Sequence, residues 1–236
     1  MLARGVLSAL FAAPLLPAPA PAVDAAARVT SQATLRIAVG AGEEARPLVV
    51  GLYGDDAPAS VKVFRGMCDG SLVGPEVTYR GSVVSRVERD RAFVMGRPPS
   101  GAAQALDRSI DSTGYVRSKL VNLAEAFAND DRNDLKHDRA GVVSMLRGGG
   151  EFDFVVAPAA NPQLDGSNVV IGQVLNLDEA QGAALIDEIN TVPVRQPKAE
   201  TALFGAVAKA GGDPRARIES VNKPLRKIQI LGCEWR

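Results

Sequence analysis

The segment from Leu135 to Val174 constrains the fold of this chain most strongly. It contains three short runs of β-branched and apolar residues, at 142–145, 154–156 and 169–174, with no long helical pattern between them. The second and third runs are joined by a connection rich in Pro, Asn, Asp and Gly. Short strand-forming runs separated by turn residues are typical of neighbouring antiparallel strands. The segment therefore predicts an antiparallel sheet.

Composition favours one mainly β domain and excludes some classes of function. The 236 residues are 46% hydrophobic and include 23 glycines and 15 prolines, which suits one core with many turns. Lys and Arg number 27 and so do Asp and Glu, so the net charge is zero and a nucleic-acid partner is not expected. The single histidine, His137, and the two distant cysteines have no zinc-ligand spacing, so no metal site and no His-based triad are expected.

The N-terminal 27 residues differ in kind from the rest. Arg4 precedes an apolar run from Gly5 to Leu16, which a Pro/Ala stretch and small residues at 25–27 follow. This pattern indicates an export signal, too short and too proline-rich to span a bilayer. A disordered Ala/Pro tail is the alternative. We expect residues 1–27 to be a targeting segment or tail and residues 28–236 to form the folded domain, with no transmembrane helix in the mature chain.

The residues before the central segment predict a hairpin, a helix and a further strand. Residues 34–39 and 46–52 form two strand-like runs around a glycine-containing turn. Pro58 followed by apolar residues on one face predicts an amphipathic helix that ends at Gly70 and covers an open end of the sheet. Residues 77–87 are interpreted as one strand that carries Arg86.

Two further segments have a weaker pattern. Residues 98–134 are polar and predict a long loop over a groove, or a surface for a partner. Ala199 to Lys209 has helical spacing between Pro197 and Gly211 and predicts a short amphipathic helix.

Five separated motifs stand out along the chain, namely residues 51–58 with 63–68, residues 79–86, residues 135–137 with 141–145, residues 164–166, and residues 169–174. In their order and spacing they resemble the cyclophilin family of peptidyl-prolyl isomerases. The resemblance covers about residues 34–235, and the tail at 212–217 and 222–233 is similar to the plastid, thylakoid-lumen branch. It implies a closed eight-stranded antiparallel β-barrel capped by two helices, at 57–68 and 178–189.

The family's reaction is rotation about the peptide bond before proline. The uncatalysed barrier is about 18–20 kcal/mol, because the C–N bond has partial double-bond character. A cation that hydrogen-bonds near the prolyl nitrogen draws its lone pair out of resonance, while an apolar pocket holds the ring. The resemblance implies an isomerase without a cofactor that acts on proline-containing polypeptides in the thylakoid lumen. A periplasm or a secretory lumen is the alternative compartment.

Arg86 matches the catalytic arginine of the family, and its alternative is an ordinary surface arginine on a strand. The gap between Arg86 and Phe93 is longer here than in the family. Phe93 is expected to form the apolar floor of the pocket, and so is Met95 if this gap is absorbed before Ala92, although plain core packing would look the same from the sequence. Leu164 matches the family's pocket leucine, at a turn where the preceding tryptophan is replaced by Gln163.

Several other pocket positions depart from the family pattern. The pocket histidine falls at Asn168. The Met-Ala-Asn-Ala segment, whose backbone and asparagine bind substrate in the family, reads Met145-Leu146-Arg147-Gly148 here, and the larger Leu146 would narrow the groove. Counting back without gaps from Leu164, the family's glutamine falls at Asp153, with Phe154 and Val155 following. One gap would put Glu151 and Phe152 there instead. In either register an acid replaces the amide and would pair with Arg86.

These substitutions leave two classes of function open. The first is an isomerase with reduced or altered activity that helps exported proteins to fold. The second is a weak or inactive cyclophilin-like scaffold subunit or assembly factor on the lumenal side of a membrane protein complex. A pocket that grips a proline segment without turning it is a third interpretation. His137, which matches a loop position of the family, is interpreted as a surface histidine.

Cys68 and Cys233 are brought to the same side of the barrel by the resemblance. In an oxidising lumen they would form a redox pair that clamps the first helix to the last strand. Two buried free thiols are the preferred alternative, because sequence spacing says nothing about the Cβ separation that a disulfide needs.

Overall fold

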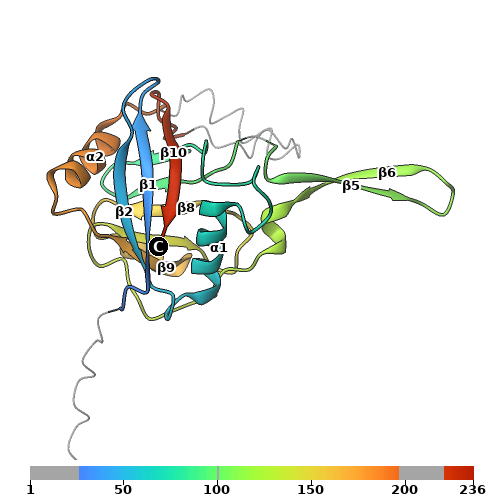
Figure 1. Cartoon of the computed structure of the whole chain (residues 1–236), viewed down its shortest axis with the longest axis horizontal. Coiled ribbons are helices and arrows are strands. Elements are labelled where there is room, and N and C mark those ends of the chain that lie inside the picture. The colour runs from blue at the N-terminus through green and yellow to red at the C-terminus, as the bar shows by residue number, and fades with distance from the viewer. Residues whose placement is uncertain (1–26, 100, 197–220) are drawn as a thin grey trace, which may run out of the picture.

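The computed structural model of the chain describes residues 27–99, 101–196 and 221–236. The expected export signal, apart from Ala27, and the expected helix at 199–209 lie outside the described residues. The described part is mainly β, with two α-helices (Figure 1). The strands are β1 (Ser31–Val39), β2 (Arg46–Leu52), β3 (Arg86–Glu88), β4 (Ala92–Met95), β5 (Gln104–Ile110), β6 (Val116–Asn122), β7 (Val142–Leu146), β8 (Phe154–Ala157), β9 (Asn168–Val174) and β10 (Ile228–Trp235).

Eight of these strands form one curled antiparallel sheet in the order β10-β1-β2-β9-β7-β8-β4-β3. The expected hairpin is confirmed as β1 and β2, and the three runs of the central segment are confirmed as β7, β8 and β9. The expected closure is not found, because no ladder joins β3 to β10 in the described residues. In place of a ladder, Val83 forms isolated bridges with Gln229 of β10 and with Arg97, so the sheet is a curled half-barrel.

The segment at 77–87 is a turn rather than the expected strand, and this explains the gap in the sheet. Gly81 has a φ of 86°, a left-handed conformation that interrupts an extended chain. The segment still bonds to β10, since the amide groups of Gly81 and Val84 donate to the carbonyls of Ile230 and Ile228. Only Arg86 to Glu88 at its end pair as β3.

The two helices cover the core of the curled sheet, α1 (Pro58–Asp69) near β10 and α2 (Ala180–Thr191) near β2 (Figure 1). Both expected helices are therefore confirmed, with α2 shifted by two residues. Helix α1 starts with Pro58 in its first turn and ends at Gly70, which adopts the left-handed conformation with a φ of 77°. In the core, the ring centroids of Phe64, Tyr79 and Phe154 lie 5.0–5.1 Å apart.

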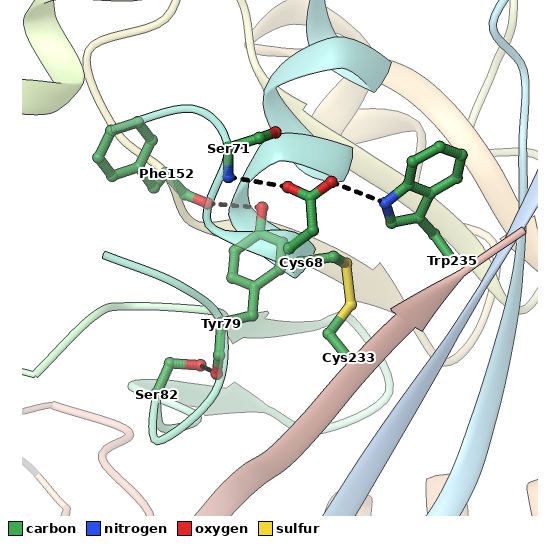
Figure 2. Close-up of a disulfide and its surroundings, with 8 residues drawn as sticks. Cys68, Ser71, Tyr79, Ser82, Phe152, Cys233 and Trp235 are labelled. Atoms are coloured by element: carbon green, nitrogen blue, oxygen red, sulfur yellow. Dashed lines mark hydrogen bonds between the residues drawn. A yellow bond between two sulfur atoms is a disulfide. The ribbon is translucent and has the colours of Figure 1, made fainter. Parts of the chain in front are cut away.

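Cys68 and Cys233 form a disulfide, so the preferred expectation of two free thiols is wrong (Figure 2). The pairing of β10 with β1 and the packing of α1 beside β10 bring the two Cα atoms to 4.9 Å. Beside the disulfide, the Trp235 indole Nε1 donates to Asp69 Oδ2 at 3.0 Å, and the Arg65 guanidinium lies 3.6 Å from the centroid of the same ring. The end of α1 is thus held to the last strand by one covalent bond and two side-chain contacts.

The segment at 98–134 is not the structureless loop that its composition predicts. Strands β5 and β6 pair from Gln104 with Asn122 to Ile110 with Val116, and a short 3-10 helix, η1 (Leu123–Ala126), follows. The hairpin extends away from the rest of the domain (Figure 1). The alternation of its apolar residues, such as Leu106 and Ile110, was the signal for a strand that the polar composition concealed.

Candidate functional site

The antiparallel register places Arg86 at the end of a row of side chains across the sheet. Arg86 lies opposite Val94, Val94 lies opposite Val155, and Val155 lies opposite Ser144. Directly opposed residues of antiparallel strands project to the same face. Val155 is half-buried and Leu146, two residues after Ser144, is 39% exposed. We call the four residues Arg86, Val94, Val155 and Leu146 the Arg86 face.

Arg86 is held on β3 beside an acidic neighbour. Its side chain is 41% exposed, and its Nε atom lies 3.3 Å from Glu88 Oε1. Glu88 is two residues further along the strand and therefore on the same face. Sequence reasoning missed this acid, although the two-residue spacing was a signal for it. Glu88 reduces the positive potential that Arg86 offers to a ligand.

The structure places Phe93 and Met95 in the core instead of on the Arg86 face. Both side chains are fully buried. Phe93 lies opposite Val87 and Val156, and Met95 lies opposite Phe154. Because side chains alternate along a strand, Val94 between them is the β4 residue that shares a face with Arg86. These two residues therefore show plain core packing, which is the alternative that the sequence left open.

Asp153 is buried, with 8% of its side chain exposed, and it pairs with Arg97. The expected pair with Arg86 is not formed. Its Oδ2 accepts from Arg97 Nη2 at 2.7 Å and from Nε at 2.9 Å. Burial raises the pKa of Asp153, and the Arg97 guanidinium and, more weakly, Arg86 oppose that shift. Of the two residues that the alternative alignment with one gap would put at these positions, Glu151 has its Oε2 atom 4.0 Å from Arg97 Nη2, and Phe152 is buried. Arg97 therefore neutralises the acid that was expected to compete for Arg86.

A second 3-10 helix, η2 (Pro162–Gly166), carries Leu164, which is half-buried. Asp165 in this turn accepts at Oδ1 from the backbone amide of His137 at 2.9 Å, and the same atom lies 2.7 Å from His137 Nδ1. His137 is fully buried, so its interpretation as a surface histidine is wrong. Burial lowers the pKa of His137, although the hydrogen bond to Asp165 acts in the opposite direction. The histidine thus supports the turn that carries Leu164.

Gln163, at the position of the family's tryptophan, contacts the loop between β3 and β4. The Arg91 guanidinium donates to Gln163 Oε1, and Asn161 Nδ2 donates to the Arg91 carbonyl at 2.9 Å. This loop contains the residues by which the spacing from Arg86 to Phe93 exceeds that of the family. The extra loop residues are therefore fixed against η2, close to Leu164.

Asn168 and Arg147, which replace two polar residues of the family's pocket, are engaged within the fold. Asn168 is buried, donates to Ser144 Oγ at 3.2 Å and accepts from Ser167 Oγ at 2.8 Å. Arg147 donates to the carbonyls of Asp131 at 2.7 Å and Asp165 at 2.6 Å. Asn168 thus joins β9 to β7 and Arg147 connects two loops, and this arrangement leaves Leu146 as the exposed residue at this end of the Arg86 face.

The chain matches the family described as "Cyclophilin type peptidyl-prolyl cis-trans isomerase/CLD" over residues 35–234. It therefore belongs to the cyclophilin-type peptidyl-prolyl cis-trans isomerases, a family of isomerases. The resemblance seen in its motifs is confirmed.

Two chloroplastic peptidyl-prolyl cis-trans isomerases of Arabidopsis thaliana are among the similar proteins. CYP28 is 29% identical over 203 residues, which cover 79% of this chain and 67% of that protein. CYP26-2 is 23% identical over 224 residues, which cover 81% of this chain and 66% of that protein. A peptidyl-prolyl cis-trans isomerase-like 3 protein of Mycosarcoma maydis is 29% identical over 106 residues, which cover 42% of this chain and 62% of that protein. The chain thus spans about two thirds of these proteins.

Within the described ranges, no group of three or more His, Cys, Asp or Glu side chains is placed to hold a metal ion. None of the helices described is long and apolar enough to cross a bilayer.

Proposed function

We propose that this protein catalyses cis-trans isomerisation of X-Pro bonds in polypeptides, with Arg86 as the catalytic cation. The observation that carries the proposal is the register, which puts Arg86 on one face with Val94 and Val155. Leu146 adds apolar surface at the end of this row, and Asp153 and Asn168 border it with their polar groups paired inside the protein.

The chemistry needs one donor and one apolar contact. A proline ring packed on Val94 and Val155 stays still while the preceding carbonyl rotates. The Arg86 guanidinium then donates a hydrogen bond to the substrate near the prolyl nitrogen. In the twisted state this nitrogen is pyramidal and holds its lone pair, so the hydrogen bond is stronger there than in either planar isomer. Only such differential binding accelerates the rotation.

Reduced activity is part of the proposal and follows from the neighbours of Arg86. Glu88 lies 3.3 Å from its Nε atom and competes with the substrate. A surface ion pair of this kind is worth about 0–1 kcal/mol, so the competition slows catalysis without abolishing it. The fully buried Phe93 and Met95 support the row from below instead of contacting the ring.

We place the protein in the thylakoid lumen of a chloroplast, where it assists the folding of exported proteins. Three observations support this location. The chain begins with an export-like segment, two similar proteins are chloroplastic by name, and a disulfide persists best in an oxidising compartment. Import of the labelled precursor into isolated chloroplasts tests it, since the processed protein should resist added protease in intact thylakoids and lose this protection when thylakoids are lysed.

The test of activity is isomer-specific proteolysis of a short X-Pro peptide. Wild type should accelerate the slow phase, and Arg86→Ala should lose most of the acceleration. Arg36→Ala removes an exposed arginine from β1 and is the matched control. No acceleration by folded wild type would refute the isomerase.

A catalytically inactive scaffold of a membrane protein complex is the second candidate. It is favoured by Arg147, whose guanidinium is used to connect loops where the family presents an asparagine to substrate. If it holds, the protein purified from thylakoid membranes should retain one stoichiometric partner and show no isomerase activity. Recovery as an active, free monomer excludes it.

A further inference from the structure

The β5–β6 hairpin exposes both of its faces and both of its edges. Nearly all of its residues are exposed between Gln104 and Leu120. Its two strands pair with each other and with no other strand of the described chain. A two-stranded hairpin without a covering layer is at best marginally stable in water. It also presents unpaired backbone groups that a further strand can join.

One face of this hairpin carries two apolar cross-strand pairs, and the opposite face carries most of its charged residues. The cross-strand pairs Leu106 with Leu120 and Ile110 with Val116 project to one face, and these four side chains are 50–72% exposed. We call these four residues the hairpin apolar face. The intervening pair, Asp107 with Lys119, projects to the opposite face. Exposed apolar groups gathered in this way mark a binding surface.

The root of the hairpin adjoins the proposed catalytic site. A cavity of about 320 Å³ is lined by residues from the root, among them Gln104 and Asn122, and by Arg97 and Asp153. Asp153 directly precedes β8 and is two residues before Val155. A polypeptide lying across Arg86 and Val155 can therefore continue past Asp153 onto the hairpin.

We propose that the hairpin is a docking arm for extended, apolar-rich segments of unfolded polypeptide, which it presents to the Arg86 face. The proposal rests on the proposed isomerase function and adds the class of client to it. The free edges accept the client's backbone as an added strand, and the hairpin apolar face accepts its alternate side chains. Short peptides that reach only Arg86 do not use the arm.

A second copy of this chain fits the hairpin apolar face less well. Arg108 projects to that face between the two apolar pairs, and the other residues there are Gln104, Ser118 and Asn122. Two copies meeting face to face would bury two arginines with no acid from either face, and burying an unpaired charge is costly. An extended client avoids this cost because it can leave Arg108 in solvent or supply an acid.

The test uses reduced, carboxymethylated α-lactalbumin as a permanently unfolded probe. Fluorescence anisotropy measures how tightly this probe binds to three forms of the protein. They are wild type, the double variant Leu106→Ser with Leu120→Ser, and the double variant Asp107→Ser with Lys119→Ser. The two double variants change neighbouring cross-strand pairs on opposite faces. The apolar double variant should bind at least tenfold more weakly, and the charged one should match wild type within about twofold. All three should isomerise a tetrapeptide equally.

If the serine substitutions unfold the hairpin, a second variant tests the docking arm. In this variant a short glycine-containing turn replaces residues 104–122. It should lose α-lactalbumin binding and keep tetrapeptide activity. Equal affinity of wild type and this variant overturns the docking arm. So does a wild-type dimer in sedimentation that the apolar double variant abolishes, or binding to anionic vesicles in place of α-lactalbumin. If wild type binds α-lactalbumin through the arm but no tetrapeptide is isomerised, the proposed function fails and the arm stands.

Discussion

The Nε atom of Arg86 lies 3.3 Å from Oε1 of Glu88, the residue two positions further along the same strand. The cation that we propose for the reaction therefore has an acid of its own beside it. Asp153, the acid expected in this role, is paired with Arg97 instead. The activity of this protein should depend on how strongly Glu88 holds the guanidinium.

Glu88→Gln should raise kcat/KM for an X-Pro peptide by about two- to fivefold, because removing a surface ion pair changes the free energy by about 0–1 kcal/mol. The measurement is the tetrapeptide isomerisation rate at low and at high salt, since salt screens the same pair in wild type. Glu44→Gln changes an exposed acid in the β1–β2 turn and serves as control. A fall in activity for Glu88→Gln would show that this acid positions Arg86 instead of competing for it.

The packing of β4 separates a structural role from a functional one. Phe93→Ala should lower the free energy of unfolding by about 3–5 kcal/mol, as for other buried aromatic residues. Val155→Ser, on the Arg86 face, should lower kcat/KM with a smaller loss of stability. Urea unfolding and the peptide assay on both variants check this. The interpretation fails if Phe93→Leu, which keeps the core filled, loses activity as completely as Val155→Ser.

His137 should make the fold less stable in mild acid. Burial lowers the pKa of His137 below its ordinary value of 6.5, so the unfolded chain binds a proton where the folded chain does not. Stability is then lost as the pH falls below 6.5 towards the folded pKa. The urea midpoint of wild type should fall more between pH 7.5 and 5.0 than that of His137→Gln.

Asp165→Asn provides the control for this pH effect, because it removes the carboxylate that faces His137 Nδ1. Asp165 favours the protonated histidine, so the variant should show an even larger fall in midpoint than wild type. Identical falls in wild type and His137→Gln would contradict the assignment.

The disulfide between Cys68 and Cys233 should stabilise the fold by about 2–5 kcal/mol, the range found for native disulfides that close long loops. Reduction, or Cys68→Ser with Cys233→Ser, should lower the urea midpoint by the corresponding amount. Thiol counting in denaturant without reductant checks the bond itself. Two free thiols in the protein isolated from its own compartment would refute the pairing.

Much of the sheet was predictable because its strands are buried or alternate, and such strands have a strong local signal. The runs at 142–145 and 169–174 became β7 and β9 for this reason. Residues 77–87 were wrongly predicted to be one strand, because the alternation of apolar and polar residues does not show that Gly81 adopts a positive φ. The β5–β6 hairpin was missed because its exposed strands mix apolar and charged residues, which resembles a polar loop.

The site was less predictable than the fold, because its geometry depends on register and not on residue type. Whether Phe93 or Val94 shares a face with Arg86 is decided by the pairing of β3 with β4. A shift of one residue would exchange them. The partners of Asp153 and His137 are likewise set by contacts across more than 25 positions of sequence, at Arg97 and Asp165. Motif matching singled out Arg86, whose catalytic role stays a prediction, but did not identify the residues around it.

The most direct measurement is the rate of cis-trans exchange of an X-Pro peptide at equilibrium, by NMR exchange spectroscopy, with catalytic amounts of protein. Wild type should produce exchange well above the uncatalysed rate, Arg36→Ala should match it, and Arg86→Ala should be about 100- to 1000-fold slower, as expected when one transition-state donor is removed. Equal exchange with wild type and a folded Arg86→Ala variant would contradict the account.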